Sequence, residues 1–234
     1  MLHLDQISVA MDAGTLAADA CLAPCQTVAV LGASGAGKST LLDAIAGFRS
    51  LAAGRIFWND QRLDTQSPQA RPVSILFQEG NLFPHLTVGQ NLGLALQPNG
   101  RRLSKDQRRR IDSALAEVGL AGYAPRMPGT LSGGQISRAA LARVLLQDRP
   151  ILLLDEPFSA LGPATRRDML ALVRTVSDRI GALTIMVTHD PQDAKTAADA
   201  VMLVADGRVE PPQQTGALFA DPPPALRAYL GLGD

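Results

Sequence analysis

Residues 27–47 read TVAVLGASGAGKSTLLDAIAG. An apolar run rich in β-branched residues comes first, and this pattern is typical of a buried strand. A glycine-rich turn follows, and apolar residues at helical spacing then continue to Gly47, which is a stop signal for a helix. The stretch therefore predicts a strand, a tight turn and a helix in direct succession.

The turn fits the pattern G-x-x-x-x-G-K-[ST] from Gly32 to Ser39. Its glycines let backbone N–H groups face an anion, and the following helix adds the positive end of its dipole. We expect Lys38 to reach the β- and γ-phosphates of a nucleotide and the Ser39 hydroxyl to ligate Mg²⁺. The predicted phosphate-binding residues are Gly32, Ala33, Ser34, Gly35, Ala36, Gly37, Lys38, Ser39 and Thr40.

Composition excludes several classes of protein. Of the 234 residues, 46% are hydrophobic and 19% are charged, which excludes wholesale disorder. The formal net charge is zero, so a general nucleic-acid coat, which needs a basic excess, is disfavoured. Cys21 and Cys25 are too few for a disulfide scaffold and have no second ligand pair at zinc spacing. With no secretory signal and no long apolar run, we expect a cytosolic chain that meets a membrane through a partner.

Other apolar runs outline the fold. Strands are predicted at 55–58, 73–77, 151–154, 183–188 and 201–205, and helices at 166–179 and 225–230, the latter in a proline-rich tail. Strand, helix and strand in this order favour a largely parallel sheet in an α/β core. Residues 82–147 hold few strand-like runs, so we interpret them as a helical insertion into that core.

Within the insertion, Ser104 and Gln107 stand at capping-box spacing and predict a helix start. Six basic residues lie between Arg101 and Arg110. A solvated helix face is the ordinary interpretation of such a cluster, and binding of nucleic acid or lipid headgroups is the alternative.

Two acids follow the apolar run at 151–154. A carboxylate at the end of a buried parallel strand lies where α/β sheets bind their ligands. Asp155 is therefore a candidate Mg²⁺ ligand, and Glu156 is a candidate to polarise an attacking water. His189 follows another strand, but a lone histidine there is more often an ordinary core or surface residue.

A second glycine motif, LSGGQ at 131–135, opens another helix. Ser132 and Gln135 again have capping-box spacing, and the exposed N–H groups of a helix start attract anions. The chain thus has two separate anion-binding helix starts.

Together these motifs resemble the ATP-binding subunits of ABC transporters over essentially the whole chain. The resemblance is carried by the phosphate loop, Gln78 after a strand, LSGGQ, ILLLDEP at 151–157, SALG at 159–162 and His189. It implies a single nucleotide-binding domain over 1–234. This domain would have a P-loop NTPase core of mixed sheet at 1–81 and 148–234, and a helical signature subdomain at 82–147.

The resemblance also implies a head-to-tail homodimer with ATP and Mg²⁺. Each ATP would lie between the phosphate loop of one chain and the signature of the other, so a symmetric pair forms two identical sites. In this family pattern the signature residues that bind nucleotide are Ser132, Gly133, Gly134 and Gln135. Gln78 would sense the γ-phosphate and join Ser39 and Asp155 at the metal, Glu156 would be the catalytic base, and His189 would contact the γ-phosphate.

Within the family, residues 71–96 look like the subunits that serve thiamine import in Gram-negative bacteria. That likeness implies a two-domain membrane permease docked near residues 78–92 and, indirectly, a periplasmic solute-binding protein. It also implies a peripheral place on the cytoplasmic face of the inner membrane, and no nucleic acid. The alternatives are import of another solute such as iron, polyamine or molybdate, a lipid or export role, a non-transport ATPase of the same superfamily, and a soluble kinase or GTPase.

Four positions depart from the family pattern. Met11 stands where an aromatic residue usually stacks on adenine, so we expect little discrimination between ATP and GTP. Ser137 replaces the second glutamine after the signature, and Gly162 replaces the aspartate of SALD. Cys25 stands where a turn glycine is usual.

Overall fold

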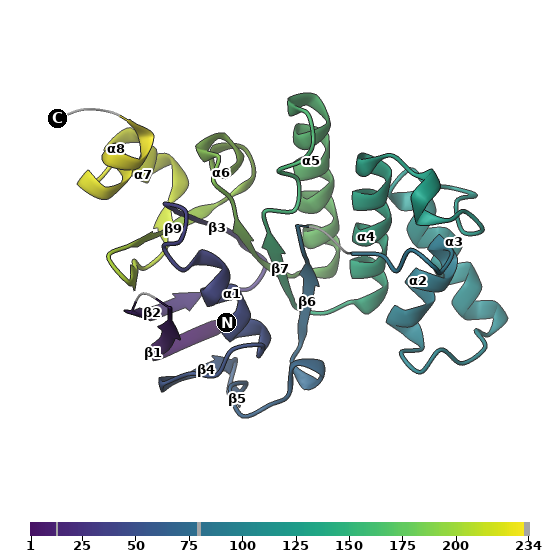
Figure 1. Cartoon of the computed structure of the whole chain (residues 1–234), viewed down its shortest axis with the longest axis horizontal. Coiled ribbons are helices and arrows are strands. Elements are labelled where there is room, and N and C mark those ends of the chain that lie inside the picture. Colours follow the sequence, from purple (N-terminus) through teal and green to yellow (C-terminus); the bar gives the residue numbers. More distant parts are fainter. Residues whose placement is uncertain (13, 79–80, 232–234) are drawn as a thin grey trace.

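A computed structural model describes residues 1–12, 14–78 and 81–231 of the chain (Figure 1). The strands are β1 (Leu2–Met11), β2 (Gly14–Leu22), β3 (Thr27–Gly32), β4 (Ala53–Trp58), β5 (Gln61–Arg62), β6 (Val73–Leu76), β7 (Ile151–Asp155), β8 (Leu183–Val187), β9 (Ala200–Ala205), β10 (Arg208–Val209) and β11 (Gln213–Gln214). The α-helices are α1 (Lys38–Ala46), α2 (Val88–Leu96), α3 (Lys105–Glu117), α4 (Gly133–Gln147), α5 (Pro163–Ile180), α6 (Pro191–Ala197), α7 (Thr215–Ala220) and α8 (Pro224–Leu230).

The described strands form an 11-stranded mixed sheet in the order β5-β4-β1-β2-β10-β9-β3-β8-β7-β6, with β11 also paired to β9. Strands β9, β3, β8, β7 and β6 run parallel to one another. The β1, β2, β4 and β5 strands pair antiparallel at the other side. The sheet is therefore the mixed sheet expected of a P-loop NTPase core.

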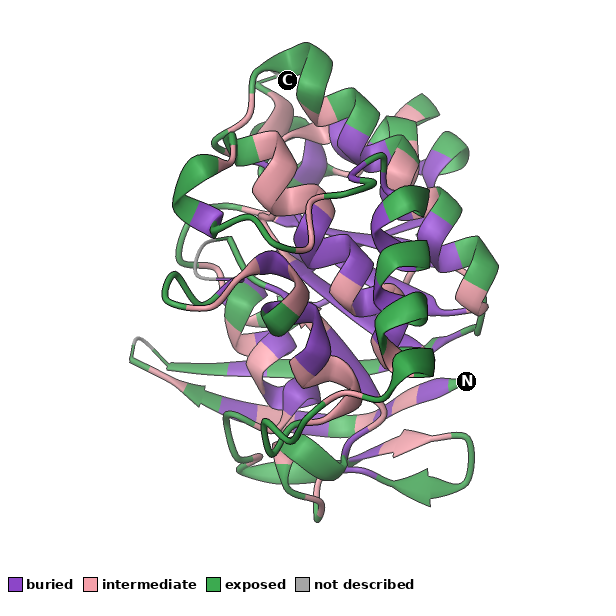
Figure 2. Cartoon of the chain, turned by 90° about the vertical axis from the view of Figure 1, so that its right-hand side faces the viewer, coloured by how far each residue is buried: buried purple, intermediate pink, exposed green. Residues whose placement is uncertain are grey.

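The central strands are covered on both faces. Along β3, Val28 and Val30 pack into the core beside α1, whereas Ala29 and Leu31 pack into the core on the opposite face. Figure 2 shows these strands buried between helices whose outer sides are exposed. Because both faces are apolar, the parallel strands appear in the sequence as continuous apolar runs, as predicted.

Between β6 and β7 lie the three helices α2, α3 and α4, beside α5 in Figure 1. The predicted capping boxes at Ser104 and Ser132 both form, with Gln107 and Gln135 as the reciprocal partners. The tail contains α7 and β11 as well as the predicted helix α8. Residues 2–22, where no element is predicted from the sequence, form β1 and β2.

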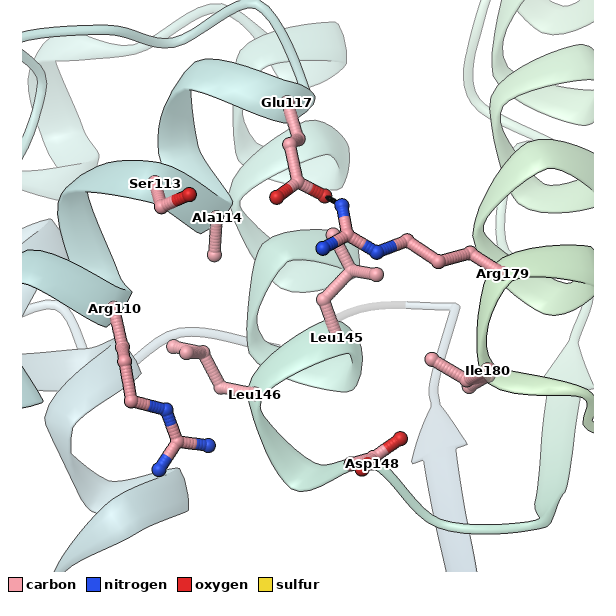
Figure 3. A pocket seen from close by; sticks show the side chains of 9 residues that line it. All are labelled: Arg110, Ser113, Ala114, Glu117, Leu145, Leu146, Asp148, Arg179 and Ile180. Carbon is pink, nitrogen blue, oxygen red and sulfur yellow. Dashed lines mark hydrogen bonds and ion pairs between the residues drawn. The ribbon is translucent and has the colours of Figure 1, made fainter.

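A hollow of about 370 Å³ separates α3 and the end of α4 from the end of α5 (Figure 3). Arg179 of α5 reaches across it and forms an ion pair with Glu117 of α3. Both side chains are partly exposed, so water screens this link between the helices and the sheet side of the molecule.

Candidate functional site

One edge of the sheet gathers most of the predicted site. The parallel strands β3, β8, β7 and β6 are neighbours, so their carboxyl ends meet at the same edge. The phosphate loop, His189, Asp155 with Glu156, and Gln78 follow these four strand ends. This is the position at which open α/β sheets bind ligands.

The phosphate loop is shaped by glycines. Gly35 and Gly37 have φ values of +77° and +105°, a region that favours glycine. A Cβ on Gly37 would stand 2.7 Å from the sulfur of Met11 and 3.2 Å from a methyl of Leu16, so the loop admits no side chain there. Met11, at the end of β1, thus lies directly against the loop.

Lys38 begins α1 and is buried. Its Nζ donates hydrogen bonds of 2.8 Å to the carbonyl oxygens of Gly32 and Ala33. Burial lowers the pKa of the Lys38 ammonium, and the charges of Glu156 and Asp155 oppose that change. The cation is therefore held within the loop, beside the N–H groups that would face a phosphate.

The candidate metal position is defined by Ser39 and Asp155. The Ser39 hydroxyl donates a hydrogen bond of 3.1 Å to Oδ1 of Asp155. Burial raises the pKa of the Asp155 carboxyl, Glu156 adds to the rise, and the bond from Ser39 opposes it. A hydroxyl and a carboxylate are hard oxygen donors, and Mg²⁺ in nucleotide sites takes few protein ligands besides phosphate and water. The donor set therefore fits Mg²⁺.

Glu156 and His189 face each other. Nδ1 of His189 lies 2.9 Å from Oε2 of Glu156, and both side chains are accessible to water. Glu156 has φ +43°, and its N–H donates to the carbonyl of Val187 at 3.1 Å. A non-glycine residue in this region is strained, and such strain is concentrated at functional sites. The pair can hold a water and accept its proton.

Residues 188–190, the histidine loop, connect β8 to α6 and are held by groups that sequence reasoning missed. The buried hydroxyl of Thr188 donates to Oδ2 of Asp193 at 2.7 Å and accepts from the N–H of Asp190 at 3.1 Å. Arg166 of α5 donates to the same Asp193 oxygen at 3.1 Å. The polar residues Thr188, His189 and Asp190 directly after β8 were a sequence signal for part of this hydrogen-bond network.

A further contact comes from α8, whose Tyr229 hydroxyl donates to the carbonyl of His189 at 2.6 Å. Because the two residues stand 40 positions apart, no local pattern could reveal this bond.

The signature residues lie elsewhere in the chain. Ser132 and Gln135 cap α4, and in Figure 1 α4 lies well apart from α1 with β6, β7 and α5 between them. A Cβ on Gly134 would stand 3.1 Å from Cγ2 of Thr165, and one on Gly133 would stand 3.4 Å from a Leu161 methyl. The signature thus packs on the start of α5, and one chain does not bring it to its own phosphate loop.

The predicted docking segment 78–92 begins at Gln78, which is exposed, and ends in α2 at Leu92. Its residues Glu79 and Gly80 lie outside the described residues. Beside the segment, the exposed rings of Phe48 and Phe77 stack with centroids 6.3 Å apart. Phe83 is also exposed.

The sequence profile described as "ABC transporter" matches residues 17–159. Three relatives are named thiamine import ATP-binding protein ThiQ. That of Cereibacter sphaeroides is 58% identical over 231 residues, covering 99% of this chain and all of the relative. That of a Ruegeria species is 53% identical with the same coverage. That of Yersinia pestis is 46% identical over 232 residues, covering 99% and 98%.

Among solved structures, the fold is similar to a dimeric post-hydrolysis state of the ATP-binding cassette MJ0796 bound to ADP and Pi. The TM-score is 0.76 and the identity is 26%, covering 92% of this chain and 99% of that one. The profile spans more than half of the chain, and the identity to its relatives extends over nearly their full length. This chain belongs to the ABC transporter family.

Proposed function

We propose that this chain is the ATP-hydrolysing subunit of an ABC importer for thiamine or its phosphates. The assignment of thiamine as the solute rests on the 58% identity, over essentially the whole chain, to a protein named for thiamine import. The observation that supports hydrolysis is the cluster of Ser39, Asp155, Glu156 and His189 beside the phosphate loop.

In this proposal the loop N–H groups and Lys38 bind the β- and γ-phosphates of ATP. Ser39, Asp155 and Gln78 would hold Mg²⁺, and the bound ion would neutralise charge on the phosphates. Glu156 accepts a proton from a water whose oxygen forms a bond to the γ-phosphorus, and the bond from that phosphorus to the bridging oxygen breaks. His189 orients Glu156 through the contact of its Nδ1 with Oε2, and the rest of its ring faces the γ-phosphate.

We also propose that the working unit is a head-to-tail homodimer. Ser132 and Gly133 are exposed at the start of α4. In Figure 1, α4 lies apart from α1, the helix that follows this chain's own phosphate loop. A second copy would bring its Ser132–Gln135 turn to that loop and complete the ATP site. ATP would make its full set of contacts in the closed pair alone, so binding drives closure and hydrolysis releases it.

The permease is proposed to dock at residues 78–92. Phe77, directly before this segment, and Phe83 within it are large apolar side chains that are exposed, and aromatic residues are enriched at protein interfaces. Residues 82–147 carry most of this segment and the signature, so we propose that they move as a helical subdomain against the core at 1–81 and 148–234. The subunit would then lie at the cytoplasmic face of the inner membrane, and a periplasmic protein would deliver the solute to the permease. None of the described helices has the length and apolar character to cross a bilayer.

Uptake of labelled thiamine tests this function in cells with the native operon, comparing wild type with Lys38→Ala. Iron and spermidine uptake are measured in parallel. We expect thiamine uptake alone to be lost. Unchanged thiamine uptake with the variant expressed would contradict the thiamine assignment, and loss of iron or spermidine uptake instead would name the replacement.

A further inference from the structure

The C-terminal helix α8 reaches the catalytic edge of the sheet through one side chain. Leu226 anchors this helix, because it is fully buried in the core that also contains α4 and α5. Ala225, Ala228 and Tyr229 line a hollow of about 430 Å³, which Gly32 and Ala33 of the phosphate loop also line. The tyrosine thus shares a hollow with the phosphate loop and also contacts the loop that carries His189.

The hydroxyl of Tyr229 donates a hydrogen bond of 2.6 Å to the backbone carbonyl of His189. Residues on either side of the histidine are held by other bonds, through Thr188 and Asp190. Among the described residues, Tyr229 is the hydrogen-bond donor to the His189 carbonyl itself.

We infer that Tyr229 is a positioning residue for hydrolysis: it fixes the peptide of His189 so that the imidazole meets the Glu156 carboxylate. This inference rests on the proposed function. The orientation of the His189 peptide sets where its ring lies, and the ring nitrogen is 2.9 Å from Glu156. Rotation of that carbonyl would move the ring away from the carboxylate that receives the proton.

The phenol is suited to this donor role at neutral pH. Burial raises the pKa of Tyr229, and the negative charges of Glu156 and Asp190 raise it further. The hydroxyl therefore keeps its proton at neutral pH and can donate it to the His189 carbonyl.

Tyr229→Phe tests the inference, because it removes the hydroxyl and keeps the ring. We expect kcat for ATP hydrolysis to fall about three- to tenfold, the loss expected for one neutral hydrogen bond, with KM for ATP within about twofold of wild type. Arg227→Ala is the matched control, since Arg227 is exposed on the same helix. It should leave kcat unchanged.

A double-mutant cycle with His189→Ala separates positioning from general support of the fold. If Tyr229 acts through the histidine, Tyr229→Phe lowers kcat in the wild type and has no further effect on the residual activity of His189→Ala. An equal fold-decrease in both backgrounds would overturn the inference, as would wild-type kcat in Tyr229→Phe.

Proton NMR of the nucleotide-free protein gives a readout that does not depend on activity. The chain has three histidines, so the ring signals of His3, His85 and His189 can be assigned with single substitutions. In Tyr229→Phe we expect the His189 signal to shift and the other two to stay. An unmoved His189 signal would contradict the inference, whereas a wild type that fails to hydrolyse ATP would contradict the proposed function.

Discussion

Oδ1 of Asp155, at the end of β7, lies 3.1 Å from the hydroxyl of Ser39 in the first turn of α1. This bond joins the strand that carries the candidate acids to the helix that follows the phosphate loop. The bond holds together the two oxygen donors proposed for Mg²⁺, and the Asp155 carboxylate in it is partly buried.

Asp155→Asn should abolish hydrolysis and stabilise the nucleotide-free protein at neutral pH. Burial raises the pKa of Asp155 above its ordinary 3.8, so its folded state is favoured by protonation and loses stability as pH rises through the raised pKa. Asparagine accepts from Ser39 without that cost, and each kcal/mol gained should raise Tm by about 2–4 °C.

Thermal melts of both proteins between pH 3 and pH 8 measure this effect. The difference in Tm should be smallest below pH 3.8, where the carboxyl is protonated in both states, and should grow and level off as pH rises. Equal Tm values at neutral pH would contradict the burial argument.

Glu156→Gln should lower ATP hydrolysis at least about 100-fold and trap an ATP-dependent dimer. Glutamine keeps an oxygen beside Nδ1 of His189 but cannot accept a proton from water. Light scattering after size exclusion should give a dimer with ATP and a monomer with ADP.

A second substitution checks that this dimer uses the signature. Gly134→Asp places a side chain against Thr165 and a negative charge at the start of α4, so Glu156→Gln with Gly134→Asp should stay monomeric in ATP. Dimers of undiminished affinity in the double variant would exclude the head-to-tail arrangement.

Gly162→Asp should raise basal ATPase activity or change its coupling to transport. Gly162 is the N-cap of α5 with an extended backbone, and a Cβ there meets nothing within 4 Å, so aspartate fits. As an N-cap it should add a few tenths of a kcal/mol to stability, about 1 °C in Tm. Gly162→Ala is the control without the carboxylate, and identical rates and coupling in all three proteins would refute the role given to this position.

Wild-type protein should bind ATP and GTP within about threefold of each other, because Met11 offers the base a polarisable but unspecific contact. Met11→Tyr should tighten ATP binding about fivefold through ring stacking. Competition against a fluorescent nucleotide measures both. A clear preference of the wild type for ATP would count against this account of Met11.

Local signals were sufficient for much of the fold. The glycine turn before Lys38 and the capping pairs of Ser104 and Ser132 depend on neighbours within a few residues, and each forms as predicted. The strand β1 was not predicted from the sequence, because its pairing register shifts between Leu4 and Ile7, where Gln6 has a positive φ. That bulge breaks the period of two that marks a strand.

The residues of the candidate site also differ in whether local sequence predicts them. Local motifs predict Lys38 and Asp155, whereas His189 by itself is typical of an ordinary histidine and is given a role only by the family pattern. Tyr229 and Arg166 act on the histidine loop from distant parts of the chain. Contacts of this kind depend on how helices pack across the sheet, which no short window of sequence encodes.

The first turn of α5 touches two functional regions at once. Its neighbour Leu161 and its own Thr165 pack on the signature glycines, while Arg166 bonds to Asp193 in the network behind His189. In the proposed symmetric pair, the signature of a chain would complete one ATP site and its histidine would act at the other. The first turn of α5 would then couple the nucleotide state of one ATP site to that of the other. The two nucleotides would bind and react as a coupled set, with a sigmoidal dependence of rate on ATP and a Hill coefficient above one.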